Sequence, residues 1–136
     1  MATPGRILYV EDDPVMAEMY RFGLERAGYA VTVAPDAAAG LTLLGSRRFD
    51  LVLLDVMLPG KDGITMLAEI RANPALGSMP VAILSNSERG REVDEKARRL
   101  GILAWMTKVW APPSTVVRAV NRWLDPMGLT RSAQKA

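Results

Sequence analysis

Polar residues able to do chemistry follow four of five short apolar runs of the sequence, each at the point where a β-strand would end. They are Glu11-Asp12-Asp13, Asp55, Ser85 and Lys108. Clustered carboxylates repel one another unless a cation is present, and a small site with only oxygen ligands suits a hard ion such as Mg²⁺ or Mn²⁺. The lysine ammonium and the serine hydroxyl suit the oxygens of a phosphoryl group. These residue types predict phosphoryl transfer in which a central carboxylate, best supplied by Asp55, becomes an acyl phosphate.

The positions of these residues depend on five apolar runs that are typical of β-strands. The runs are Ile7–Val10, Ala30–Val33, Leu51–Leu54, Val81–Leu84 and Leu103–Met106. Two of them are continuously apolar rather than alternating, as expected of parallel strands covered on both faces. Segments with helical spacing follow the runs, at 14 to 27, 37 to 47, 64 to 73, 88 to 100 and 113 to 124.

The alternation of strands and helices predicts an α/β fold, a (βα)5 doubly wound parallel sheet. Such folds bind ligands beyond the carboxyl ends of their strands, which is where the polar residues fall. Asp13 before Pro14, and Asp36, have the types expected of helix N-caps. Gly28 and Gly101 stand where two of the helices should end.

The composition excludes several classes of function. Histidine and cysteine are absent, which rules out disulfides, thiol catalysis, histidine-bound zinc and serine–histidine triads. The net charge of +2 is too small to argue for nucleic acid as a direct partner. No run approaches the ~20 apolar residues of a membrane span, so we expect a cytoplasmic protein without a membrane partner.

The 136 residues, 49% of them hydrophobic, suffice for one domain with its own core. We expect that domain to occupy residues 1–124. Residues 125–136 lose the apolar period and are expected to be a tail or the start of a linker.

Four ordered motifs resemble those of the receiver domains of two-component response regulators, the family that includes the bacterial chemotaxis regulator. The motifs are VEDD at 10–13, LLDVMLPGKDG at 53–63, ILSNS at 83–87 and GILAWMTK at 101–108. The similarity extends over residues 6 to 124. It implies a flavodoxin-like sheet with strand order 2-1-3-4-5.

The resemblance also implies a role for each matching residue. Glu11 and Asp12 take the place of the acidic pair that binds the metal ion. Asp55 matches the phosphoacceptor and is itself a metal ligand, and the backbone carbonyl of Met57 is another. The expected ion is Mg²⁺ or Mn²⁺.

Three further positions match the residues that sense the phosphoryl group. Ser85 takes the position of the switch hydroxyl, and Lys108 matches the family lysine. Trp105 matches the aromatic residue that swings inward when the hydroxyl moves toward the phosphoryl group, although an aromatic at a strand end is also a common packing residue.

The function implied by the resemblance is regulation rather than turnover. A sensor histidine kinase or a histidine phosphotransfer protein would donate to Asp55 in a Mg²⁺-dependent reaction. The surface of the fourth helix, fifth strand and fifth helix would then alter binding to a downstream protein target, an output domain or a second copy of the chain. Only slow self-dephosphorylation is expected. Two alternatives are a receiver scaffold that acts without phosphorylation and an aspartyl-nucleophile phosphatase, although such phosphatases typically carry an aspartate where this chain has Met57.

Some residues have simpler interpretations or depart from the family pattern. Asp13 is best interpreted as a helix cap, and Ser87 as the cap of the helix expected to open at position 88. The family usually has a cis proline after its lysine, whereas Val109 follows here, for which a trans bond is the default. Trp110 either covers apolar surface or belongs to a partner-binding face, and Asn86 is bulky enough to restrict access to the phosphoryl group.

The fourth predicted helix carries only a narrow apolar stripe. Val93, Ala97 and Leu100 form this stripe, and charged residues occupy most of the remaining positions. We therefore expect weak docking of this helix, a property shared by elements that switches move.

Overall fold

Five parallel strands form a single sheet in the order β2-β1-β3-β4-β5, which confirms the predicted flavodoxin-like topology. The computed structural model of the chain describes residues 5–86 and 90–124. The strands are β1 (Arg6–Val10), β2 (Ala30–Ala34), β3 (Leu51–Leu54), β4 (Val81–Ser85) and β5 (Trp105–Thr107).

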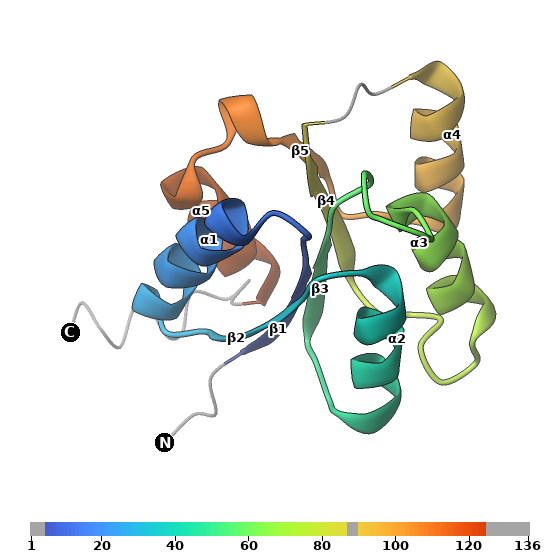
Figure 1. Ribbon diagram of the computed structural model, residues 1–136, viewed down its shortest axis with the longest axis horizontal. Helices are drawn as coiled ribbons and strands as arrows, with labels where there is room; N and C mark the ends of the chain where they lie inside the picture. The colour runs from blue at the N-terminus through green and yellow to red at the C-terminus, as the bar shows by residue number, and fades with distance from the viewer. Residues whose placement is uncertain (1–4, 87–89, 125–136) are drawn as a thin grey trace.

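Helices cover both faces of the sheet (Figure 1). The α-helices are α1 (Pro14–Arg26), α2 (Ala37–Ser46), α3 (Gly63–Ala72), α4 (Arg91–Leu100) and α5 (Pro113–Leu124). Figure 1 shows α1 and α5 on one face and α2, α3 and α4 on the other, which is the doubly wound arrangement. No helix among the described residues is both long and apolar enough to cross a membrane.

The core consists of two apolar clusters, one on each face of the sheet. Successive strand residues point to opposite faces, so that Ile7 and Tyr9 pack on the α1 and α5 side. Leu8 and Val10 pack against the cluster of α2, α3 and α4. Both sides of the central strands are therefore buried, which explains why the β3 and β4 sequences are apolar without alternation.

The predicted N-caps Asp13 and Asp36 are confirmed. The Asp13 carboxylate accepts hydrogen bonds from the backbone of Val15 at 2.9 Å and of Met16 at 3.3 Å, and Asp36 accepts one from Ala39 N at 2.8 Å. Gly101 ends α4 with φ of 92°, a left-handed conformation that favours glycine.

Two predicted boundaries near the end of the sheet differ in the structure. The fifth strand was predicted at Leu103–Met106 but covers Trp105–Thr107, because Leu103 is exposed and only its N–H joins the ladder, donating to Val81 O at 2.8 Å. A 3-10 helix, η1 (Lys108–Trp110), follows the strand directly and was not predicted.

Two other predictions concern residues outside the described part of the chain. Helix α4 is described from Arg91, with Gly90 as its N-cap, whereas the expected start at 88 and the proposed cap Ser87 lie outside the described residues. The tail or linker expected at 125–136 also lies outside them.

The connection between β3 and α3 folds back so tightly that one position must be glycine. Gly63 N donates to Val56 O at 2.9 Å, and a Cβ atom at Gly63 would lie 2.1 Å from the backbone oxygen of Asp55. Real Cβ atoms do not approach backbone oxygens this closely. The absence of a side chain at Gly63 thus fixes the path of the chain immediately after Asp55.

Replacing Gly63 with alanine tests this constraint. We expect Gly63→Ala to lower the free energy of unfolding by about 1–3 kcal/mol in urea denaturation, because the backbone of Asp55 must move. Gly45→Ala is the matched control, since its Cβ would meet nothing within 4 Å inside α2. It should raise stability by about 0.5–1 kcal/mol. Equal urea midpoints for the two variants would contradict this account.

Candidate phosphoryl-transfer and metal site

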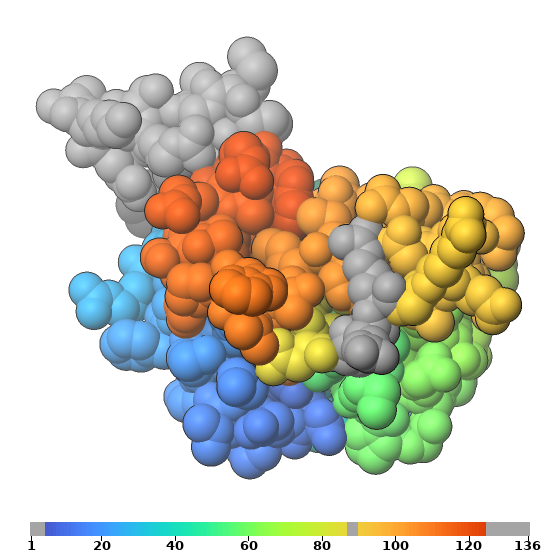
Figure 2. Space-filling model, turned by 90° about the horizontal axis from the view of Figure 1, so that it is seen from above, coloured from blue at the N-terminus to red at the C-terminus, as the bar shows by residue number. Residues whose placement is uncertain are grey.

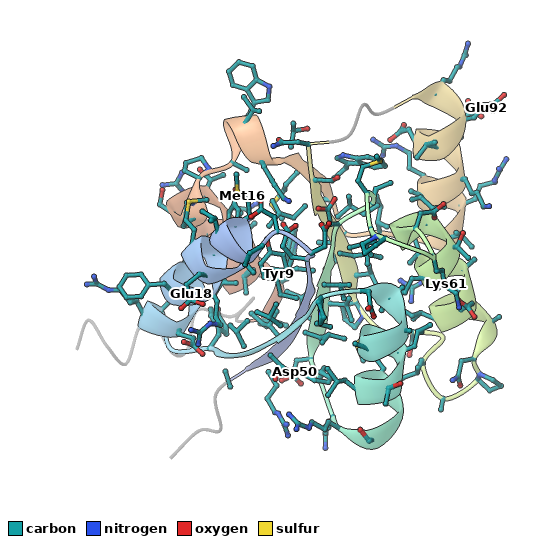
Figure 3. All side chains as sticks on the ribbon, in the orientation of Figure 1. Tyr9, Met16, Glu18, Asp50, Lys61 and Glu92 are labelled. Atoms are coloured by element: carbon teal, nitrogen blue, oxygen red, sulfur yellow. The ribbon has the colours of Figure 1, made fainter. Side chains whose placement is uncertain are left out.

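The polar residues predicted to act together meet at the carboxyl edge of the sheet. Glu11 and Asp12 follow β1, Asp55 follows β3, Ser85 ends β4, and Lys108 follows β5. Figure 3 labels Asp50, which lies at the opposite end of β3 and marks the other edge. The order of the parallel strands therefore brings residues from four separate segments to one place.

Three carboxylates converge at this edge. One oxygen each of Glu11, Asp12 and Asp55 lies within 4.8 Å of the others. Glu11 and Asp55 are only 2% and 5% exposed, whereas Asp12 is exposed. Asp13 does not join them because its side chain caps α1. Three converging oxygen donors, one of them open to solvent, fit a hard divalent cation such as Mg²⁺.

Lys108 lies between the two buried carboxylates. Its Nζ atom forms an ion pair with Glu11 Oε1 and lies 3.0 Å from Asp55 Oδ2, and its side chain is 6% exposed. Burial lowers the pKa of Lys108, but its hydrogen bonds to Glu11 and Asp55 outweigh burial and raise that pKa overall. The ammonium group therefore stays charged and neutralises part of the negative charge of the site.

The pKa of Glu11 is raised because burial disfavours its charge, although Lys108 and Tyr9 act in the opposite direction through hydrogen bonds. Tyr9 OH donates to Glu11 Oε1 at 2.8 Å, and Asp13 N donates to Oε2 at 3.2 Å. The Glu11 carboxylate thus has three donors, whereas Asp12 is the member of the pair that faces solvent.

Asp55 is held by donors on both of its oxygens. The Ser85 hydroxyl donates to Oδ1 at 2.5 Å, and Met57 N donates to the same oxygen at 3.1 Å. Lys108 donates to Oδ2. Ser85 is fully buried, so its hydroxyl is directed at the carboxylate rather than at solvent. These contacts orient the nucleophile and supply positive and hydrogen-bonding groups where a phosphoryl group would sit.

Tyr9 is a residue of the site that sequence reasoning missed. It lies on β1 (Figure 3). It is fully buried, and its ring packs edge-on against Tyr20 with 6.1 Å between the ring centroids. The signal was present in the sequence, because Glu11 follows β1 directly and stands two residues after Tyr9, a spacing that points both side chains to the same side of an extended chain. A buried tyrosine also needs a partner for its hydroxyl.

Hydrogen bonds hold the connection from β5 to α5 at two points. The Lys108–Val109 peptide is trans, as predicted. Val109 N donates to Asn86 Oδ1 at 3.0 Å, and Tyr20 OH donates to Ala111 O at 2.6 Å. Asn86 therefore holds the loop that carries Lys108. Trp110, predicted either to cover apolar surface or to belong to a partner-binding face, is 81% exposed, which argues against the first of these roles.

Trp105 lies inside the molecule, on the side of the sheet covered by α4. It is buried in the same apolar cluster as Ala97 of α4 and pairs with Ile83 of β4, two residues before Ser85. This position is compatible with either role predicted for Trp105, packing or switching.

The sequence from residue 7 to residue 121 matches the family described as the response regulator receiver domain. The chain is 45% identical over 85 residues to the transcriptional regulatory protein CseB of Streptomyces coelicolor, a match that covers 62% of this chain and 35% of CseB. It is 35% identical over 127 residues to the phosphate regulon transcriptional regulatory protein PhoB of Escherichia coli, covering 91% of this chain and 55% of PhoB. The matched stretches thus span between about a third and about half of these curated relatives.

Solved structures show the same similarity in three dimensions. A CheY-like response regulator receiver domain protein from Methanospirillum hungatei superposes with a TM-score of 0.83 at 25% identity, covering 91% of this chain and 96% of that chain. The phosphorylated cyanobacterial phytochrome response regulator RcpA superposes with a TM-score of 0.79 at 28% identity, covering 90% and 95%.

The different surroundings of the two neighbouring aspartates give a direct test. We expect Asp12→Ala to weaken Mg²⁺ binding, measured by calorimetric titration, by roughly a factor of ten or more, a loss that even outer-sphere partners of a metal can cause. Asp13→Ala should leave Mg²⁺ affinity close to the wild-type value but lower the free energy of unfolding by about 1 kcal/mol, because the cap is lost. Asp13→Asn, which keeps the cap, is the control. Equal losses of Mg²⁺ affinity in Asp12→Ala and Asp13→Ala would contradict these assignments.

Proposed function

Because this chain belongs to the family of response regulator receiver domains, we propose that Asp55 accepts a phosphoryl group from a sensor histidine kinase or a histidine phosphotransfer protein. A bond forms between an Asp55 carboxylate oxygen and phosphorus while the bond from phosphorus to the donor nitrogen breaks. The observation that carries the proposal is the setting of Asp55, whose two oxygens accept bonds from Ser85 and Lys108.

The metal-binding part of the proposal assigns Glu11, Asp12, Asp55 and the backbone carbonyl of Met57 as the groups that would hold Mg²⁺ or Mn²⁺. The converging carboxylate oxygens support it. The cation supplies positive charge to the oxygens of the phosphoryl group. Lys108 and Ser85 supply a second charge and a hydroxyl donor from the other side of Asp55.

We propose a signalling phosphoacceptor rather than a catalyst of turnover. A phosphatase with an aspartyl nucleophile would typically carry a second aspartate at position 57, where this chain has an exposed methionine. A scaffold that acts without phosphorylation would have no need for three donors, from Ser85, Lys108 and the Met57 backbone, aimed at Asp55. Both alternatives are therefore less well supported than phosphorylation.

The proposed output is a change in the surface formed by α4, β5 and α5. The Ser85 hydroxyl already points at Asp55, and Trp105 is already buried, so phosphorylation would stabilise this inward arrangement. A downstream protein target or an output domain would recognise the surface, as would a second copy of the chain in a phosphorylation-dependent dimer. In this proposal residues 1–124 are the receiver domain, 125–136 are a tail or linker, and the domain does not contact nucleic acid itself.

Exposed apolar side chains surround the site and support a protein as the donor. Figure 2 looks onto the carboxyl edge of the sheet. The large apolar residues exposed at this edge are Val15, Met57, Val109 and Trp110. Solvent-exposed apolar residues gathered around a buried nucleophile are typical of a docking surface for another protein.

Intact-mass measurement tests the phosphoacceptor assignment. Incubation with Mg²⁺ and a small phosphodonor such as acetyl phosphate should add one phosphoryl group to the wild-type chain. Asp55→Asn should gain none, because an amide cannot form the acyl phosphate. Lys108→Met, which keeps the length of the side chain, controls for loss of the neighbouring charge and should be phosphorylated more slowly. A folded wild-type chain that gains no phosphate, or an Asp55→Asn chain that gains as much, would refute the assignment.

The Trp110→Ala variant distinguishes an effect on docking of the donor protein from an effect on the phosphorylation reaction. We expect Trp110→Ala to slow transfer from a phosphorylated histidine donor protein by roughly tenfold, the scale of losing an exposed aromatic anchor. Its phosphorylation by acetyl phosphate should keep the wild-type rate. Leu103→Ala, which trims an exposed apolar residue at the opposite edge of the sheet, should alter neither rate. Equal slowing with both donors would mean that Trp110 acts on the site itself.

A further inference from the structure

One arginine joins the C-terminal end of α4 to the rest of the molecule. Arg71, in the last turn of α3, donates from Nε to Leu100 O at 2.6 Å and from Nη2 to Gly101 O at 2.7 Å. Its Nη1 atom donates to Gly77 O at 3.1 Å and to Met79 O at 2.8 Å. A single half-buried guanidinium thus connects α3, the segment before β4 and the end of α4.

The chemistry of this contact suits a helix end. The last carbonyls of a helix lack partners within the helix and carry partial negative charge. A guanidinium is planar and offers five N–H donors in a fixed geometry, so it can serve several carbonyls at once. A lysine has one nitrogen and cannot reproduce this geometry. A Cβ atom at Gly101 would lie 3.7 Å from Arg71 Nε, an ordinary contact, so glycine is favoured there by its φ of 92° and not by the arginine.

Among the described residues, the N-terminal half of α4 packs less closely than the C-terminal half, since Val93 is only half-buried against the apolar cluster whereas Ala97 is fully buried. Gly90 caps it without any side-chain hydrogen bond, and Ala97 is the only buried residue among those described in the helix. A cavity of about 270 Å³ lies between the first turns of α4 and the start of α3. Its lining residues are Val56, Asp62, Ile64, Thr65, Glu92, Val93 and Lys96. The two ends of α4 therefore differ in how they are attached.

The loosely held half of α4 also lies nearest to the phosphoacceptor. Val56 follows Asp55 in the chain, lines the cavity, and its N–H lies 3.5 Å from the Ser85 hydroxyl oxygen. A movement of Ser85 or of the chain after Asp55 therefore reaches Val56 and changes the space beneath the first turns of α4. The end held by Arg71 lies at the opposite end of the helix, where Leu100 and Gly101 lead into β5.

We propose that Arg71 is a positioning residue that anchors the C-terminal end of α4, so that the helix opens and moves from its N-terminal end. Changes at Asp55 are then expressed as movement of the first turns of α4 about this anchored end. The anchor stands on the contacts of Arg71 alone, whereas its role in signalling rests on the proposed phosphorylation of Asp55.

Hydrogen exchange of the unphosphorylated chain tests the anchor. An unanchored helix frays at both ends, whereas here amides 99–101 should exchange roughly tenfold more slowly than amides 94–96. Arg71→Met should speed exchange at 99–101 by roughly tenfold and leave 94–96 near the wild-type rate. In Arg71→Lys, the exchange rate at 99–101 should lie between those of the wild-type chain and Arg71→Met. Arg48→Met, which removes an exposed guanidinium elsewhere, should change neither segment.

Two results would overturn the anchor. One is equal exchange in the two halves of α4 in the wild-type chain, a comparison that needs no variant to fold. The other is an Arg71 variant in which both halves of α4 and the sheet accelerate together, since that pattern reflects a general loss of stability.

The link to signalling is tested by repeating the exchange after acetyl phosphate and Mg²⁺, with intact mass reporting the phosphorylated fraction. Phosphorylation should change exchange at 94–96 in the wild-type chain and extend to 99–101 only in Arg71→Met. If phosphorylation of the wild-type chain changes exchange equally at 94–96 and 99–101, then α4 does not move about an anchored C-terminal end. Failure of Asp55 to gain phosphate would instead count against the proposed function, and the anchor would still be decided by the first comparison.

Discussion

Two buried carboxylates side by side require a compensating positive charge, and the rest of this site depends on that constraint. Glu11 and Asp55 are both buried at the carboxyl edge of the sheet, and Lys108 lies between them. Removing charges from water costs several kcal/mol per ion, at about the scale of a whole domain's stability margin. A buried ion pair is therefore weak evidence for stability and better evidence that the arrangement serves a reaction.

The same constraint explains why the surroundings of the site are so firmly connected. Lys108 can balance the charge only if its loop is held in place, which the bonds of Asn86 to Val109 and of Tyr20 to Ala111 accomplish. In the proposed reaction, a divalent cation and a phosphoryl group bring charges of opposite sign into this arrangement. The ammonium can then exchange one oxygen partner for another without leaving the site.

The sequence predicted the elements that local patterns determine and missed contacts between distant segments. The apolar runs of β3 and β4 and the cap at Asp13 depend on neighbouring residues, and the structure agrees with them. Strand periodicity could have placed Tyr9 and Glu11 on the same side of the chain. The sequence alone did not show that the Tyr9 hydroxyl donates to the buried Glu11 carboxylate. The contacts of Arg71 join side-chain nitrogens to backbone carbonyls 29 and 30 residues away, and such acceptors leave no residue-type pattern in a sequence.

The proposed function requires Asp55 to carry the phosphoryl group in a site completed by Lys108, Ser85 and a divalent cation. A crystal structure of the full chain with Mg²⁺ and beryllium trifluoride, a stable analogue of the phosphoryl group, tests it most directly. We expect beryllium bonded to an Asp55 oxygen, fluorines in contact with Lys108 and Ser85, and Mg²⁺ held by Glu11, Asp12, Asp55 and the Met57 carbonyl. Beryllium trifluoride on another carboxylate, or a metal ion bound away from these aspartates, would contradict it.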